Sequence, residues 1–439
     1  MPHTPKQTDF ILIGVDGGAT ETKANAVACD DFDHPTSFVL RAEAAARAYD
    51  RLPDFVPLPL TDQLAQRDAG PLKLTAPEHA QGTLWVASTA EAVADVAGQC
   101  GARRVLVGIG MPGLKTADGR GNCVVNNGPR IPDYLNQFEQ RLSELKVELV
   151  VPVAALGSDA DYCGVGELYA ADGLFRDVPN AYYLGGGTGL AEALKLHGRL
   201  VTFDEACGWI QKAWQIPSAL GPTFEKLVSA KSMNDGYARL VGSSPSGAPR
   251  FPEADAADGQ PPAVAWMDTV ALTLAELIFE RLDTIKNGRR ETAHRGDAYR
   301  ALTPAHEFRG TSLDRVVIGQ RVGQIYADPR YGPVFGAKLD SYLAAYTAAS
   351  GDAEMISRYL VDDPLESGRA GSARHLPTRD DTVGSAPQTR HMPAGDDAVA
   401  SVGQTDPPRL KPGFVCASKL RAAPALGAAV AAVQALRQR

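Results

Sequence analysis

The sequence predicts an α/β fold with two lobes, and three observations lead to this prediction. A short apolar run, a glycine turn and a second apolar run follow one another at residues 10–28, and the same succession returns at residues 180–198. Between them, residues 150–157 form an apolar run closed by proline and glycine, which is typical of a buried strand. A chain of 439 residues also suggests about two to three domains.

Composition and charge are those of an ordinary globular protein, with 44% hydrophobic and 22% charged residues. The formal net charge is -8 and no basic stripe appears, which argues against nucleic acid as a partner. Six cysteines without a Cys-x-x-Cys pair predict neither a zinc site nor a disulfide framework. No apolar run has membrane-spanning length, and residues 1–9 lack the apolar core of a signal peptide. We therefore expect a cytoplasmic protein with reduced thiols and no membrane partner.

The first glycine turn lies between a predicted strand at residues 10–15 and another at 24–28, and it reads Asp16-Gly17-Gly18-Ala19-Thr20-Glu21-Thr22-Lys23. Backbone N–H groups converge in such a turn and can hold a phosphate oxygen. Thr20 would add a hydroxyl group and Lys23 a positive charge. An Asp-Gly-Gly sequence is also a common hairpin turn, so this motif alone leaves both interpretations open.

The next part of the chain supplies a helix, a strand and a polar loop. Residues 52–74 are rich in proline and are predicted to be irregular, whereas residues 78–101 are predicted to form a helix. Residues 104–109 are predicted to form a buried strand that leads into a Gly-Met-Pro-Gly turn at 110–113. The loop Asn126-Asn127-Gly128-Pro129 can hydrogen-bond hydroxyl groups, or it can be an ordinary turn cluster.

Asp159 is the candidate general base. It stands where the predicted strand at residues 150–157 turns into a helical segment of small residues that reaches Glu167. In α/β folds, ligands bind beyond the carboxyl ends of the strands, so a carboxylate at this point can face a ligand. The alternative is that Asp159 only caps the helix, as aspartate often does.

The second glycine turn repeats the first. A predicted strand at residues 180–184 enters it, a predicted strand at 190–196 leaves it, and the turn reads Gly185-Gly186-Gly187-Thr188-Gly189. Two such hairpins with an acidic strand end between them are much more specific than either hairpin alone. Together they predict a cleft that holds a polyphosphate from both sides.

The remaining chain supplies core elements and loops. The sequence predicts a strand at 313–318, which ends in Gly319-Gln320, and helices at 205–214, 222–233, 263–285, 335–349 and 422–438. Segments 240–262 and 363–412 are rich in Gly, Pro and Ser and are predicted to be flexible, the second of them as an insertion, a lid or a surface loop. We expect a first lobe at residues 1–150, joined by a C-terminal helix within 415–439, and a second lobe at 151–414.

The order of these motifs resembles the superfamily that joins acetate and sugar kinases, heat-shock chaperone ATPases and actin, and within it the ROK family of sugar kinases. The resemblance extends from residue 11 to about residue 436, with insertions. The family's first phosphate motif is similar to residues 16–23, its Gly-x-Pro-Gly turn to 110–113, its catalytic segment to 158–167, its second phosphate motif to 187–193 and its adenosine motif to 316–320.

This resemblance implies an actin-like ATPase fold of the ribonuclease H type with an interlobe cleft. It also implies a glucokinase-like transfer of the γ-phosphoryl group of ATP to a hydroxyl group of a hexose or amino sugar. By the same match, Asp159 would deprotonate the sugar hydroxyl and Asp16 would hold Mg²⁺ through water. The ATP phosphates would be bound by Asp16, Gly17, Gly18, Thr20, Lys23, Gly186, Gly187, Thr188 and Gly189, and adenosine by Gly319 and Gln320. The sugar would be bound by Asn126, Asn127, Ser158, Asp159, Glu205 and Glu225.

The sequence departs from the family pattern at several points. The cysteine-rich zinc segment of the family is missing, so no zinc is expected. Gln320 replaces a glycine of the adenosine motif, and Glu192 replaces a glycine of the second phosphate motif, where it would repel phosphate unless it points away.

These departures keep two alternatives open: a non-catalytic sugar or nucleotide sensor on the same fold, and a BadF-type ATPase that drives another protein. The BadF-type proteins use clustered cysteines, which this chain lacks. The expected partner is a small-molecule sugar, and a homodimer is a possible assembly.

Overall fold

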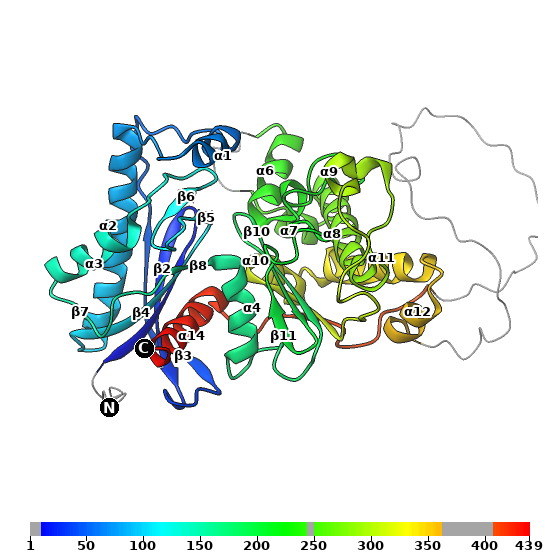
Figure 1. Cartoon of the computed structure of the whole chain (residues 1–439). Coiled ribbons are helices and arrows are strands. Elements are labelled where there is room, and N and C mark those ends of the chain that lie inside the picture. Colours follow the sequence, from blue (N-terminus) through cyan, green and yellow to red (C-terminus); the bar gives the residue numbers. More distant parts are fainter. Residues whose placement is uncertain (1–9, 244–249, 362–406) are drawn as a thin grey trace, which may run out of the picture.

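The computed structural model describes residues 10–243, 250–361 and 407–439. Two lobes lie side by side, and each is built on its own β-sheet with helices packed around it (Figure 1). The chain forms the first lobe, passes into the second, and returns to the first lobe with its last helix (Figure 1).

The first lobe is built on a sheet of six strands. These are β1 (Ile11–Gly17), β2 (Glu21–Cys29), β3 (Phe38–Ala48), β4 (Arg104–Met111), β7 (Glu148–Leu149) and β8 (Leu156–Ser158). Their order is β3-β2-β1-β4-β7, with β8 also paired to β4. The pairs β1/β2 and β2/β3 are antiparallel, whereas β4 runs parallel to β1, β7 and β8.

The second lobe contains a sheet of five strands. These are β9 (Ala181–Gly186), β10 (Leu190–Leu196), β11 (Arg199–Val201), β12 (Arg315–Gly319) and β13 (Val415–Ala417). Their order is β11-β10-β9-β12-β13. A separate pair of short strands, β5 (Leu114–Lys115) and β6 (Asn122–Val124), belongs to the first lobe.

The two sheets repeat one topology. In each sheet an antiparallel run of three strands is extended by parallel strands beside its first strand, so β9 takes the place of β1 and β12 that of β4. This repeat is the arrangement of the two-lobed actin-like ATPase fold, which is also called ribonuclease H-like. The fold class predicted from the sequence is therefore confirmed.

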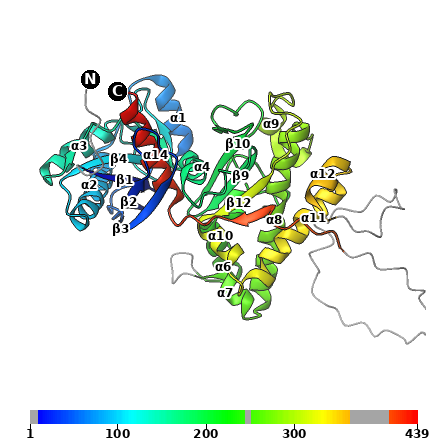
Figure 2. The ribbon, with the colours of Figure 1, turned by 90° about the horizontal axis from the view of Figure 1, so that it is seen from below.

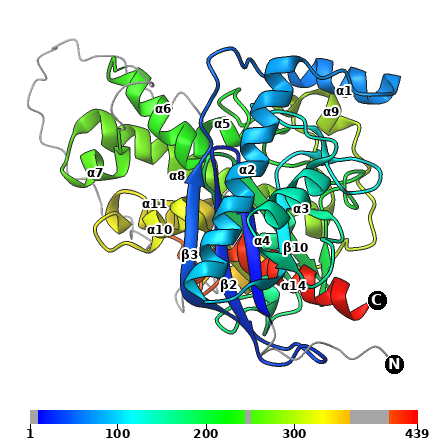
Figure 3. The same cartoon turned by 90° about the vertical axis from the view of Figure 1, so that its left-hand side faces the viewer.

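Helices cover both faces of the first sheet. They are α2 (Ala76–Gln99), α3 (Tyr134–Glu144) and the last helix, α14 (Ala423–Arg437), whereas α1 (Leu60–Ala69) packs beside β6. α2 and α3 cover one face, which Figure 3 shows from the outside, and α14 covers the other. A Cβ atom on Gly14 of β1 would lie 1.8 Å from the carbonyl oxygen of Ala425, so glycine lets α14 touch the sheet.

The helix α4 (Asp159–Tyr169) connects the two lobes. It packs against α14 on one side and against β10 on the other, and the two helices lie side by side between the sheets (Figures 1 and 2). Small residues permit this close packing, since a Cβ atom on Gly164 would lie 2.6 Å from the Cβ atom of Ala193. The N-terminus of α4 is thereby fixed relative to both sheets.

Most helices of the second lobe gather around the long helix α8. The helices of this lobe are α5 (Glu225–Val228), α6 (Ala230–Leu240), α7 (Pro252–Ala257), α8 (Pro261–Asn287), α9 (Gly296–Arg300), α10 (Gln320–Ala327), α11 (Gly336–Ala349) and α12 (Ala353–Tyr359). It also contains two short 3-10 turns, η2 (Ala293–Arg295) and η3 (Gly332–Val334). By length and composition α8 could span a membrane, the one such helix in the described ranges. It carries the buried Arg281 and Asp283 and packs inside the lobe, so we treat it as a core helix.

Four local predictions were wrong. Residues 150–155 are not a strand, because β7 ends at Leu149 and β8 begins at Leu156. Residues 205–214 form turns rather than a helix. The predicted helix at 222–233 is broken at Ser229, which caps α6 by accepting a hydrogen bond from the Ser232 N–H. The segment 52–74 contains the helix α1, which was not predicted because the segment is rich in proline.

The two predicted flexible segments have different outcomes. Within 240–262, residues 252–257 form α7, in which Pro252 and Ala256 are buried, so this part is ordered by packing. Residues 363–406 of the second segment lie outside the described residues. The end of that segment is described, and Leu410 forms an isolated β-bridge with Leu360.

Candidate active site

Strand register brings Asp16 and Asp159 to the same edge of the first sheet. Asp16 of β1 stands beside Gly110 of β4, and Gly110 stands beside Gly157 of β8. Asp159 follows β8 directly as the first residue of α4. A Cβ atom on Gly110 would lie 3.4 Å from the Cα atom of Asp159, so glycine lets the start of α4 approach the strand end.

The cap of α4 is Ser158 and not Asp159. The Ser158 hydroxyl accepts a hydrogen bond from the Asp161 N–H at 3.2 Å, which is the usual N-cap contact. The Asp159 carboxylate accepts a hydrogen bond from the adjacent Ala160 N–H at 3.0 Å. The interpretation of Asp159 as the helix cap is therefore wrong, and its carboxylate is available for another role.

Both carboxylates carry raised pKa values. Burial raises the pKa of Asp16 to about 7, and the neighbouring Asp159 charge adds to this, while Lys23 opposes it. Burial also raises the pKa of Asp159, against the lowering effect of the Lys115 and Lys212 ammonium groups. Two neighbouring carboxylates with raised pKa values at a strand end are the kind of arrangement found at catalytic sites.

Two lysines whose charges act on Asp159, and an aspartate that pairs with one of them, were not predicted from the sequence. The Lys115 ammonium donates to the carbonyl oxygens of Met111 and Gly113 at 2.7 and 2.8 Å, and burial lowers its pKa to about 8. The Lys212 ammonium, from the second lobe, pairs with Asp204 at 2.8 Å. Lys115 follows the Gly-Met-Pro-Gly turn by two residues, a spacing that could have drawn attention to it; no local pattern marks Lys212.

The first glycine turn lies directly beside Asp16. Gly17 ends β1, and Gly18 and Thr20 form the bend before β2, with Thr20 exposed at the tip. Lys23 stands opposite Asp16 in the β1/β2 register, and its ammonium pairs with Glu21 at 2.7 Å. The Lys23 ammonium, which was predicted to bind phosphate, therefore forms an ion pair with the Glu21 carboxylate.

The second glycine turn occupies the equivalent place in the second lobe. Gly186 ends β9, and Gly187 donates its N–H to the Gly189 carbonyl oxygen at 3.0 Å, with Thr188 exposed between them. Glu225 lies against this turn, since its carboxylate accepts the Leu190 N–H at 3.0 Å. The structure thus places Glu225, a predicted sugar-binding residue, in contact with the phosphate turn.

Gln320 lies across the backbone of the second glycine turn. Gly319 is the register partner of Gly185, and Gln320 begins α10 with a positive φ of 55°. A Cβ atom on Gly187 would lie 2.9 Å from the Gln320 Oε1 atom. The Gln320 amide also approaches the Cys163 Sγ atom of α4 at 3.9 Å. A glycine would adopt this backbone without strain, whereas glutamine is strained there.

The remaining predicted sugar-binding residues lie in different surroundings. Asn126 and Asn127 are exposed in the turn that follows β6, and Ser158 stands beside Asp159. Glu205 is half-exposed and pairs with Arg199 at 2.7 Å on the surface. It is its neighbour, Asp204, that pairs with the lysine facing Asp159.

Glu192 points away from the glycine turn. Its carboxylate lies in the core, where it accepts hydrogen bonds from Arg281 at 2.7 and 2.9 Å and from the Tyr182 hydroxyl at 2.8 Å. Alternation along β10 turns Glu192 towards α8 and its neighbours Ala191 and Ala193 towards α4. The repulsion of phosphate by Glu192 therefore does not arise.

Asp16 suits a magnesium ion held through water. Its carboxylate supplies an oxygen ligand near the Asp159 carboxylate, and a divalent cation would offset the negative charge of these two groups. No group of three or more His, Cys, Asp or Glu residues that could hold a metal occurs in the described ranges. Magnesium needs no such group where one or two carboxylates and substrate phosphates provide its ligands.

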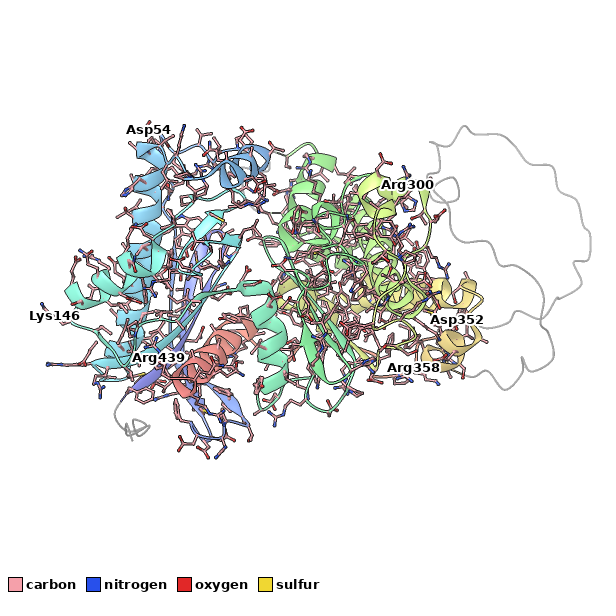
Figure 4. All side chains as sticks on the ribbon, viewed as in Figure 1. Asp54, Lys146, Arg300, Asp352, Arg358 and Arg439 are labelled. Atoms are coloured by element: carbon pink, nitrogen blue, oxygen red, sulfur yellow. The ribbon has the colours of Figure 1, made fainter. Side chains whose placement is uncertain are left out.

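Two open polar cavities lie elsewhere, on the second lobe. One, of about 440 Å³, is lined by Asn180, His197, Arg309, Gly310, Thr311, Ser312, Glu354 and Arg358. The other, of about 580 Å³, shares Glu354 and Arg358 with it. Figure 4 shows Arg358 at the outer end of the second lobe, far from the first lobe. Neither cavity includes a residue of the candidate site.

Comparisons with known proteins give structural similarity only. No protein-family model and no curated protein matches this sequence. A ROK family glucokinase from Streptomyces griseus, solved with glucose and AMPPNP, is 15% identical, with a TM-score of 0.48 over 97% of this chain and 99% of that chain. A glucokinase from Parabacteroides distasonis is 14% identical, with a TM-score of 0.44 over 99% of each chain. A ROK hexokinase from Thermus thermophilus is 18% identical, with a TM-score of 0.40 over 77% of this chain and 89% of that chain. The fold assignment rests on the strand order described above.

Proposed function

We propose that the protein is a cytoplasmic, ATP-dependent sugar kinase that transfers the γ-phosphoryl group of ATP to a hydroxyl group of a hexose or amino sugar. The observation that carries this proposal is the place of Asp159. It lies at a strand end beside Asp16, with the helix cap supplied by another residue. A carboxylate that does not cap the helix, and on which the charges of two lysines act, suits a general base.

The predicted site residues would have separate roles in this reaction. Asp159 accepts the proton of the attacking sugar hydroxyl, and the exposed amides of Asn126 and Asn127 orient the sugar. The two glycine turns bind the phosphates of ATP with their backbone N–H groups. Asp16 would hold Mg²⁺ through water, and this ion supplies charge neutralisation to the transferred phosphoryl group.

The direct test is a panel of glucose, mannose, glucosamine and N-acetylglucosamine assayed for ATP consumption. We expect one or more of these sugars to be phosphorylated, with dependence on Mg²⁺. Hydrolysis of ATP that no sugar accelerates would favour the BadF-type ATPase, and binding of sugar without any turnover would favour a sensor.

A further expectation concerns metal content. Because the described residues offer no zinc-ligand group, the purified protein should contain no stoichiometric zinc and should still need Mg²⁺ for turnover. Elemental analysis of the purified chain, with activity measured before and after treatment with a zinc chelator, checks this. One tightly held zinc ion per chain would contradict it.

One observation favours the sensor as a second candidate, namely the position of Gln320 on the second glycine turn. Its side chain occupies space next to Gly187, where the phosphates of a nucleotide would approach. A chain with a side chain at this point binds nucleotide less tightly than one with glycine there, because the glutamine has to move first.

Two substitutions separate the effects of Gln320. Gln320→Gly removes both the side chain and the backbone strain, so we expect it to raise the free energy of unfolding by about 1 kcal/mol. Gln320→Ala removes the side chain but keeps a non-glycine residue at positive φ. Both variants should bind Mg-AMPPNP more tightly, by about fivefold, or ~1 kcal/mol, the scale of ordering one flexible side chain. Calorimetry would check this, and weaker binding by either variant would show that Gln320 is a nucleotide contact instead.

A further inference from the structure

The turn that carries Asn126 and Asn127 is held by hydrogen bonds from buried residues on either side of it. The two asparagines are exposed, whereas Val125 and Arg130 on either side are buried. Asn127 has a positive φ of 60°, a left-handed conformation that asparagine tolerates better than most residues. An exposed polar pair on a rigid turn is characteristic of a binding site rather than of a mobile loop.

Gln63 of α1 holds the start of this turn. Its Oε1 atom accepts the Val125 N–H at 2.8 Å, and its Nε2 atom donates to the Val125 carbonyl oxygen at 3.0 Å. The same amide donates to the Leu58 carbonyl oxygen at 2.7 Å, which anchors the segment before α1. Gln63 is 1% exposed, so loss of these bonds would leave both backbone groups of Val125 without partners and away from water.

Arg130 holds the end of the turn. Its guanidinium forms two hydrogen bonds of 2.8 Å with the Glu78 carboxylate of α2 and donates to Gln66 of α1 at 2.7 Å. The Arg130 backbone N–H also donates to Glu78, at 3.1 Å. The start of the turn is therefore held by α1, and its end is held by both α1 and α2. Figure 1 shows α1 on the side of the first lobe that faces α6.

The turn is connected to the candidate base through Gly113. A Cβ atom on Gly113 would lie 2.1 Å from the Val124 carbonyl oxygen and 3.2 Å from the Val125 Cα atom, so the two backbones touch. The Gly113 carbonyl oxygen accepts a hydrogen bond from the Lys115 ammonium at 2.8 Å, and the charge of Lys115 lowers the pKa of Asp159. A shift of Val125 would therefore move Gly113 and Lys115, and would alter the surroundings of Asp159 where the acceptor sugar would bind.

We infer that Gln63 is a positioning residue that fixes the Asn126–Asn127 turn and thereby sets the affinity for the acceptor sugar. This inference rests on the proposed function. It assigns to α1 a role in binding the acceptor sugar, although α1 lies in a segment that was predicted to be irregular. The nucleotide is bound at the glycine turns, which Gln63 does not contact, so its affinity should not depend on this residue.

The test compares two buried glutamines. Gln63→Met keeps the volume and removes both hydrogen-bonding groups, and we expect it to raise the KM for the sugar about tenfold, with kcat and the KM for ATP nearly unchanged. Gln81→Met is the matched control. Gln81 is 2% exposed, accepts the Leu52 N–H and donates to the Asp50 carbonyl oxygen, both at 2.8 Å, and so makes the same kinds of bond to a different loop. It should lose similar stability without a change in the KM for the sugar.

The outcomes separate the inference from the proposed function. A sugar KM that rises in Gln63→Met and not in Gln81→Met supports the inference, and calorimetric titration of the same sugar without nucleotide should give the same order of affinities. Equal effects of both substitutions, or a loss of kcat with unchanged KM in Gln63→Met, would overturn the inference while leaving the kinase assignment standing. A wild-type protein that neither phosphorylates nor binds any sugar of the panel would overturn both.

Discussion

Replacement of Asp159 by asparagine is expected to lower kcat by about 10²-fold to 10⁴-fold, the usual contribution of a positioned general base. At about 1.36 kcal/mol per tenfold, this corresponds to roughly 3 to 5 kcal/mol of transition-state stabilisation. Asparagine keeps the size of the side chain but cannot accept the proton of the sugar hydroxyl. Binding of Mg-AMPPNP should change little, because the glycine turns hold the phosphates.

The controls for this substitution follow from the cap geometry. Ser158→Ala removes the N-cap contact to Asp161 and should cost about 1 kcal/mol of stability, which measures the structural role of this position separately. Asp172→Asn, at an exposed aspartate shortly after α4, should leave both rate and stability unchanged. A near wild-type rate in Asp159→Asn, with sugar phosphorylation intact, would remove Asp159 from the mechanism.

The parts of the fold that the sequence predicted are those in which local chemistry decides the conformation. The glycine turns at residues 16–23 and 185–189 leave little room for a Cβ atom, which would lie 2.0 Å from Met111 at Gly17 and 2.2 Å from Val322 at Gly186, and the strands on either side of them are apolar. Repetition of this unit was sufficient to predict two lobes. The position of Asp159 after a strand was likewise local, although the strand itself proved to be only three residues long, β8.

The parts that the sequence could not predict depend on contacts between distant segments. The charge of Lys212 lowers the pKa of Asp159 although the two residues belong to different lobes, and residues 211–214 carry no regular pattern. α1 is held by Gln63, whose partner Val125 lies 62 residues further along the chain. Glu205 was selected by its match to a sugar-binding glutamate of the family, whereas it is Asp204 that pairs with Lys212. No rule of periodicity gives such pairings.

Removal of the Arg281 guanidinium should have the largest effect on stability. Arg281 is 0% exposed and pairs with Glu192 at 2.7 Å and with Glu280 at 2.6 Å. Arg281→Met would leave two buried carboxylates without their cation, which we expect to cost about 3–5 kcal/mol. Three of the four tryptophans, at 209, 214 and 266, lie in the second lobe, so tryptophan fluorescence during urea unfolding reports mainly on this lobe.

A second substitution distinguishes loss of the ion pair from loss of packing. If unpaired charge is the cause, Glu192→Gln added to Arg281→Met should recover part of the stability, because the glutamine amide is neutral. Arg199→Met provides the surface control, since Arg199 pairs with two half-exposed or exposed glutamates and should cost only about 0–1 kcal/mol. A double variant as unstable as the sum of its single substitutions would show that packing, and not charge, is responsible.

The same pair also reaches the candidate site. Glu192 accepts the Ala213 N–H at 2.5 Å, and Ala213 adjoins Lys212, whose charge lowers the pKa of Asp159. Glu192 therefore stabilises the segment that carries Lys212 as well as the core around α8. Because this segment depends on Glu192 staying in place, Arg281→Met should lower kcat at temperatures where the protein remains folded, whereas Arg199→Met should not. An unchanged kcat in folded Arg281→Met would show that the buried pair serves stability alone.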